Sequence, residues 1–87
     1  MDANWFINFQ KKLDDHYAWP SLYTFKFIVP SEKEEDLKNL FPNHTTVGKL
    51  SKNGRYVSIT IHMMMSSSEA VVEVYQTASV IEGIIAL

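Results

Sequence analysis

The chain has 87 residues, of which 46% are hydrophobic and 21% are charged, and its formal net charge is −2. This length predicts one domain, and this composition is typical of a globular chain rather than a disordered one. The small negative charge argues against a nucleic-acid-binding protein that depends on bulk electrostatics. The absence of cysteine excludes disulfides, a thiol nucleophile and a thiolate metal site.

The sequence shows no pattern typical of a targeting or membrane signal. The N-terminal segment MDANWFINFQKK carries an acid at Asp2 and lacks the apolar run of a secretion signal. No stretch approaches the roughly 20 apolar residues that are needed to cross a bilayer. We therefore expect a cytoplasmic protein with no membrane partner.

The first expected element is a helix over about residues 2–16. Its apolar side chains recur at helical spacing, namely Trp5, Phe6, Phe9 and Leu13. Asp2 is suited to cap this helix, and Trp19-Pro20 ends it because the residue before a proline avoids helical backbone. We expect the apolar stripe to pack on the core, with a partner contact as the alternative. Residues 1–18 are thus a helical extension, and 19–87 form the core of the single domain.

Residues 21–29 (SLYTFKFIV) predict a half-buried strand, because their two faces differ in character. One face is expected to carry Tyr23, Phe25, Phe27 and Val29, and the other Thr24, Lys26 and Ile28. A capping box of Ser31 and Glu34 predicts a following helix that Pro42 ends. The acids of its first turn complement the helix dipole, so they do not indicate a metal or acid–base site.

Residues 45–52 predict a weaker edge strand, and Asn53-Gly54 predicts a tight hairpin turn in which both residues adopt positive φ. A strand over residues 55–63 should then bury Val57, Ile59, Ile61 and Met63 on one face. A second capping box, Ser66 and Glu69, predicts a helix whose buried stripe is Val71, Val74, Tyr75 and Ala78. Met65 is expected to pack on its first turn, and residues 84–87 form a last short strand after Gly83.

This order of elements predicts an α+β fold. After the extra N-terminal helix, the order β-α-β-β-α-β is that of the split, ferredoxin-like sandwich, a four-stranded antiparallel sheet with helices on one face. The first and third strands lie side by side at the centre of that sheet. They are the two strands with the clearest alternation here.

Two segments, WPSLYTFKFIVP and SKNGRYVSITIHM, together with Tyr75 ahead of the terminal IIAL, resemble the YbeD-like family of small bacterial proteins of unknown function. The positions that match the family pattern are Pro20, Lys26, Ser51, Gly54, Ser58 and Thr60. The resemblance covers about residues 19–87. It implies a ferredoxin-like fold similar to ACT regulatory domains, which bind amino acids or other small effectors, and it implies no established activity.

The residues show no catalytic constellation. The serines are expected in caps, in the hairpin or on a strand, and no nucleophile elbow or phosphate-binding loop occurs. His16, His44 and His62 belong to three different elements and lack zinc-site spacing. We expect no enzymatic activity, no catalytic residue, no cofactor and no metal.

The polar side of the two central strands is the first candidate binding surface. Lys26 would supply charge, Ser58 and Thr60 hydrogen bonds, and Tyr56 and His62 flat stacking surfaces. The second candidate is a basic hairpin formed by Lys49, Lys52 and Arg55. These residues favour a regulatory or protein-interaction module.

Three other interpretations of these surfaces stay open. The sheet or an oligomer interface could bind a small effector, and the open face could pair with a second copy of the chain. Weak binding of single-stranded RNA is a further alternative, which the small charge and the missing aromatic pair of an RNA-recognition motif disfavour.

Overall fold

The computed structural model describes residues 3–87, and its elements follow the predicted order. They are α1 (Ala3–His16), β1 (Ser21–Pro30), the 3-10 turn η1 (Ser31–Lys33), α2 (Glu34–Leu40), β2 (Thr46–Leu50), β3 (Tyr56–Met65), α3 (Ser68–Ala78) and β4 (Ile85–Ala86). The strands form one sheet in the order β2-β3-β1-β4, and every neighbouring pair is antiparallel. The prediction of a ferredoxin-like sandwich is confirmed, with β1 and β3 at its centre.

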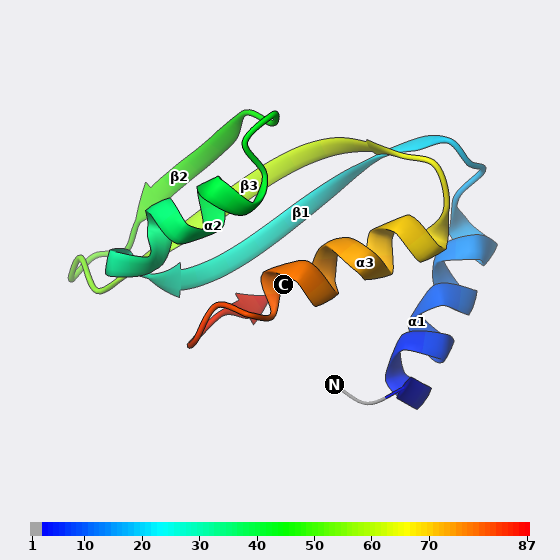
Figure 1. The fold of residues 1–87 in the computed structure, drawn as a ribbon, viewed down its shortest axis with the longest axis horizontal. Coiled ribbons are helices and arrows are strands. Elements are labelled where there is room, and N and C mark those ends of the chain that lie inside the picture. The colour runs from blue at the N-terminus through cyan, green and yellow to red at the C-terminus, as the bar shows by residue number, and fades with distance from the viewer. Residues whose placement is uncertain (1–2) are drawn as a thin grey trace.

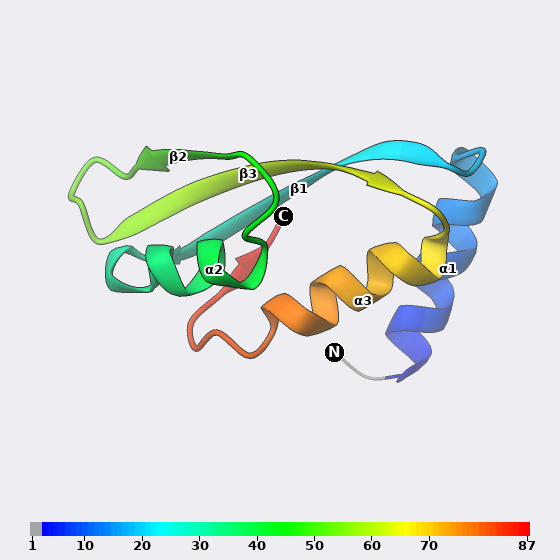
Figure 2. The same cartoon turned by 45° about the horizontal axis from the view of Figure 1, so that its top comes forward.

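The sheet has one covered and one uncovered face. Figure 2 shows α2 and α3 beneath the same face, whereas no described helix lies over the other face, which we call the open face. α1 stands at one end of the molecule and packs against α3 (Figure 1).

Alternation along the two central strands builds the core. Phe25, Ile59 and Ile61 have no exposed surface, whereas their chain neighbours lie on the open face. In the β1–β3 register Phe25 is opposite Ile61, so large apolar side chains from both strands meet under α3. Burial of these side chains is the main free energy that holds the helices on this face.

The apolar stripe of α1 covers one end of this core. Leu13 is buried, Phe6 and Phe9 pack against buried residues, and the rings of Phe9 and Tyr75 lie 5.5 Å apart. Trp5 stays 44% exposed, so the core covers this stripe only in part. The predicted cap, Asp2, lies outside the described residues.

Both predicted capping boxes were wrong. Ser31 lies in η1, its hydroxyl donates to the Gly54 carbonyl, and α2 begins at Glu34 with no side-chain cap. At α3 the cap is Ser67 rather than Ser66, and its hydroxyl accepts from the Ala70 amide at 3.1 Å. The reason is that β3 continues to Met65, two residues further than predicted. The extended backbone that an N-cap needs therefore occurs one residue later.

The hairpin turn also differs from the prediction. Residues 51–55 form a five-residue loop, and only Gly54 in it has positive φ, at +73°. Asn53 instead accepts hydrogen bonds at 3.0 Å from the Arg55 amide and the Ser51 hydroxyl through its side-chain oxygen. A side-chain hydrogen bond of this kind replaces the left-handed conformation that a two-residue turn would require of asparagine.

Both outer strands are shorter than predicted. β2 covers Thr46–Leu50 rather than 45–52, and β4 covers Ile85–Ala86 rather than 84–87. β4 pairs only with Phe27 and Ile28, and beyond it the Leu87 amide donates to the Lys26 carbonyl at 2.9 Å. Over residues 3–87, no strand pairs with this edge of β1 between residues 21 and 25.

Candidate binding surface on the open sheet face

The five residues proposed for binding all lie on the open face. In the antiparallel register Lys26 is opposite Thr60, and residues opposite one another share a face. Ser58 and His62 flank Thr60 at a spacing of two along β3, so they point to the same side, as does Tyr56. The structure therefore gathers Lys26, Tyr56, Ser58, Thr60 and His62 on one continuous surface.

This surface is more apolar than the predicted set suggests. The exposed large apolar side chains that share it with the polar residues are Leu22, Val47, Met64, Ile85 and Leu87, each more than half exposed. They were not predicted from the sequence, because only the polar members of the alternation indicate binding chemistry. Leu22 and Met64 follow the same spacing of two as Thr24 and His62, which was the available signal. Leu22 and Met64 are opposite one another in the register, and exposed apolar area of this kind is typical of an interaction surface.

The acidic side chains of residues 3–87 are confined to one side of the chain, whereas lysines occur on both sides. The four strands and the loop 51–55 contain Lys26, Lys49, Lys52 and Arg55 but no aspartate or glutamate. The described acids lie on the helices and their connections, namely Asp14, Asp15, Glu32, Glu34, Glu35, Asp36, Glu69, Glu73 and Glu82. The sheet side is therefore cationic although the whole chain carries −2.

A hollow of about 420 Å³ joins the two predicted clusters at the hairpin end of the open face. Its lining residues are Ile28, Lys49, Leu50, Ser51, Lys52, Tyr56 and Ser58. Two ammonium groups and several hydroxyl donors surround it, and Ile28 adds apolar surface. Such a set suits a carboxylate that is attached to an apolar group.

The remaining predicted residues lie away from this hollow. Lys26, Thr60 and His62 line the middle and far part of the open face, and Arg55 is not among the lining residues. His62 is held by a 2.9 Å hydrogen bond between its Nδ1 and the Thr24 hydroxyl. His62 lies six positions along β3 from Tyr56, a distance of roughly 20 Å. The two rings therefore cannot stack on neighbouring bases, as the combined stacking role would require.

The histidines do not converge in the structure. His16 ends α1, His44 lies in the connection between α2 and β2, and His62 lies on β3. No group of three or more metal-ligating side chains occurs among residues 3–87. Within the same range, no helix combines the length and the hydropathy that a membrane span requires.

A protein-family model described as "Protein of unknown function (DUF493)" matches residues 14–87. The chain belongs to this family. The finding confirms the expected YbeD-like relationship, and the match begins inside α1 rather than at residue 19. No curated protein and no solved structure is significantly similar to the chain. Membership of the DUF493 family fixes no activity, so the function has to be argued from the surface itself.

Proposed function

We propose that this protein is a cytoplasmic regulatory or protein-interaction module without enzymatic activity, and that its open face binds an acidic, partly apolar surface of a partner protein. The observation that carries the proposal is the combination of cationic and apolar side chains, with no acid, on an uncovered sheet face. Complementary charge steers association and selects partners, while burial of apolar area supplies affinity.

The hollow at the hairpin is the anchor point in this proposal. Lys49 and Lys52 attract a carboxylate of the partner, and the hydroxyls of Tyr56 and Ser58 donate hydrogen bonds to it. Ile28 contacts the apolar part of the same partner residue. Lys26 makes a second charge contact further along β1, which sets the orientation of the bound protein.

Charge also separates this proposal from the other interpretations. A face-to-face pair of two copies would bring the Lys26 and Lys49 ammonium groups of both chains together without an acid between them, which is unfavourable. Single-stranded RNA would need neighbouring stacking rings, which Tyr56 and His62 do not provide. A free carboxylate effector suits the hollow but leaves Leu22, Val47 and Met64 uncovered.

The experiment compares two double charge reversals of the full chain in affinity capture from cells. Lys26→Glu/Lys49→Glu changes the open face, and Lys11→Glu/Lys12→Glu makes the same charge change on exposed positions of α1. We expect the open-face variant to lose specific partners at least tenfold and the α1 variant to retain them. A partner so defined should have an acidic surface, and its binding should weaken with salt.

Four outcomes would contradict the proposal. Equal capture by both variants would remove the open face from consideration. Capture that nuclease abolishes would favour RNA instead of protein. A wild-type dimer that the open-face variant converts to monomer would show that a second copy occupies the face. A small carboxylate that raises the melting temperature of the wild type alone, with no captured protein, would favour effector binding.

A further inference from the structure

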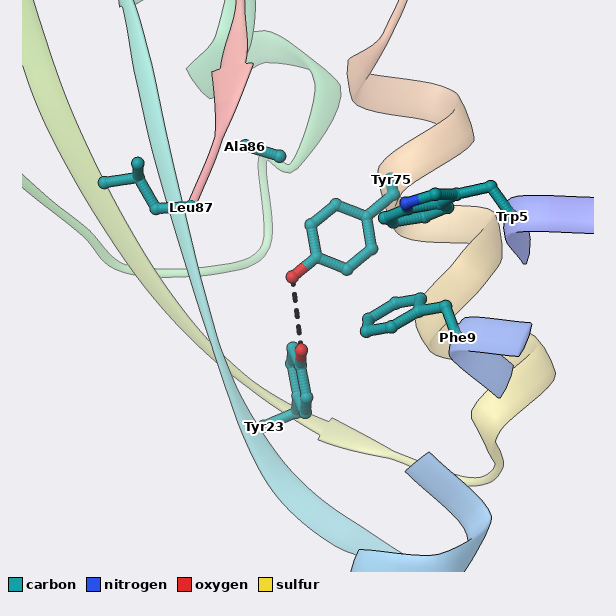
Figure 3. Close-up of a pocket in the computed structure, with 6 residues that line it drawn as sticks. All are labelled: Trp5, Phe9, Tyr23, Tyr75, Ala86 and Leu87. Carbon is teal, nitrogen blue, oxygen red and sulfur yellow. Dashed lines mark hydrogen bonds between the residues drawn. The ribbon is translucent and has the colours of Figure 1, made fainter. Parts of the chain in front are cut away.

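An aromatic cavity of about 280 Å³ lies on the covered side of the sheet, at the end opposite the basic hairpin. Its lining residues are Trp5, Phe9, Tyr23, Tyr75, Ala86 and Leu87 (Figure 3). Four of these are aromatic, and they come from α1, β1 and α3. The cavity opens where β4 ends, beside the edge of β1 that no described strand covers.

Ring contacts hold the walls of this cavity in place. The Phe9 ring lies 5.0 Å from that of Trp5 and 5.5 Å from that of Tyr75, and Tyr75 is anchored among core residues as it is only 6% exposed. Rings that pack on one another lose little entropy when a ligand binds, because they are already ordered. The walls are therefore suited to receive a large apolar side chain.

A pair of hydroxyls supplies the polar part of the cavity. The hydroxyl oxygens of Tyr23 and Tyr75 lie 3.2 Å apart, as Figure 3 shows. Burial raises the pKa of Tyr75 above the ordinary tyrosine value, and its hydrogen bond with Tyr23 raises that pKa further. A pair of phenols has two protons and uses one between them, so one O–H stays available to donate to a carbonyl.

The bare edge of β1 supplies a row of backbone hydrogen-bonding groups. The Lys26 carbonyl accepts from Leu87 on this edge. Successive residues of a strand direct their N–H and C=O groups to alternate edges, so Leu22 and Thr24 direct theirs to the same side as Lys26. Over residues 3–87 no backbone partner pairs with Leu22 or Thr24 there.

We propose that this edge binds an extended segment of a partner protein by strand addition, antiparallel to β1 and in line with β4, with one large apolar side chain in the aromatic cavity. The segment extends the backbone hydrogen bonding between β4 and β1 along the same edge. Its pairing with Leu22 and Thr24 provides affinity that does not depend on the side chains of the segment. The residue opposite Tyr23 shares the face of Tyr23, so its side chain enters the cavity. Leucine, methionine and phenylalanine have the right size and chemistry.

The cavity differs from the open face in chemistry and lies on the other side of the sheet, although Leu87 borders both. It lies on the helix side of the sheet and offers rings and backbone groups rather than ammonium groups. Failure of either proposal therefore leaves the other unaffected.

The test uses acetylated, amidated tetrapeptides Thr-X-Thr-Val, where X is alanine, leucine or phenylalanine, because Leu87 already occupies the position opposite Lys26. We expect leucine and phenylalanine to bind the full chain at least tenfold more tightly than alanine, with slower amide exchange at Leu22 and Thr24. N-methylation of the threonines on either side of X should abolish binding, because their amides face β1. N-methylation of X itself should leave binding intact, because that amide faces away.

A matched pair of variants tests the same site from the protein side. Thr24→Pro removes the edge amide, and Thr24→Val keeps it, while both lose the Thr24 hydroxyl. Binding should be lost in the proline variant and retained in the valine variant. Equal binding to both, indifference to N-methylation or to X, or no binding of any tetrapeptide up to its solubility limit would overturn the proposal.

Discussion

The two ends of the β1–β3 ribbon present different chemistry on opposite faces. At the end formed by Pro30 and Tyr56, lysines and hydroxyls surround a hollow on the open face. At the end formed by Tyr23 and Met63, aromatic rings line a cavity on the covered face. The same two strands thus hold a cationic surface and an aromatic one.

The difference follows from the period of two along a strand. Neighbouring residues such as Phe25 and Lys26 point to opposite faces, so each face varies in composition without changing the other. What decides the character of each end is the neighbouring element. The lysine-bearing hairpin lies next to the open face at one end, and α1 adds Trp5 and Phe9 to the covered face at the other.

The largest expected effect separates the two faces of β1. Phe25→Ala should lower the free energy of unfolding by about 3–5 kcal/mol, because it empties a fully buried position. Lys26→Ala, one residue away, should change it by less than about 0.5 kcal/mol because its side chain faces solvent. Urea denaturation of both variants measures the contrast. Similar losses in the two variants would show that the open face is not free of structural contacts.

A smaller effect tests the helix that carries Tyr75. Ser67→Ala should lower the free energy of unfolding by about 1 kcal/mol, because the Ala70 amide loses its side-chain acceptor. Ser66→Ala is the matched control and should stay within about 0.5 kcal/mol. Thermal or urea unfolding of the pair decides which serine caps α3. A larger loss in the Ser66 variant would restore the capping box that the sequence predicts.

An effect of similar size concerns the hydroxyl pair of the aromatic end. The pKa of Tyr75 is raised in the folded protein, so the unfolded chain loses this proton first as the pH rises past about 10. The stabilisation that comes from this pKa difference is therefore complete below about pH 10 and is lost progressively above it. Tyr75→Phe should lower the free energy of unfolding by about 1 kcal/mol at neutral pH. It should also weaken the fall of that free energy at alkaline pH. Urea denaturation at several values between about pH 8 and 11 measures this difference. If the free energy of unfolding falls in parallel for variant and wild type, the raised pKa of Tyr75 is not the cause.

Patterns local to one segment were the ones that the sequence predicted well. Alternation in β1 and β3 led to the sheet, to the central pair and to the five polar residues of the open face, and charge clustering led to Lys49, Lys52 and Arg55. The loop 51–55 and the cap of α3 depend on where hydrogen bonds of Asn53 and Ser67 form, which a one-residue shift changes. A sequence pattern does not define the end of a helix or strand to within one residue.

The aromatic cavity could not be predicted from the sequence, and the reason is different. Trp5, Tyr23 and Tyr75 are far apart in the chain, and only the docking of α1 against α3 brings their rings together. A helical stripe indicates that a face is buried, but it does not say against which element or at what angle. The bare edge of β1 was hidden likewise, since it depends on β4 being two residues long.

The claim on which the functional account depends is that another protein covers the open face. It is tested most directly by a photo-crosslinking amino acid placed in living cells at Val47, which lies on that face and is 61% exposed. Val80, which is 74% exposed in the connection between α3 and β4, is the matched control. The account predicts a discrete protein adduct from position 47 and none from position 80. Adducts of equal yield from both positions, or none from position 47, would contradict it.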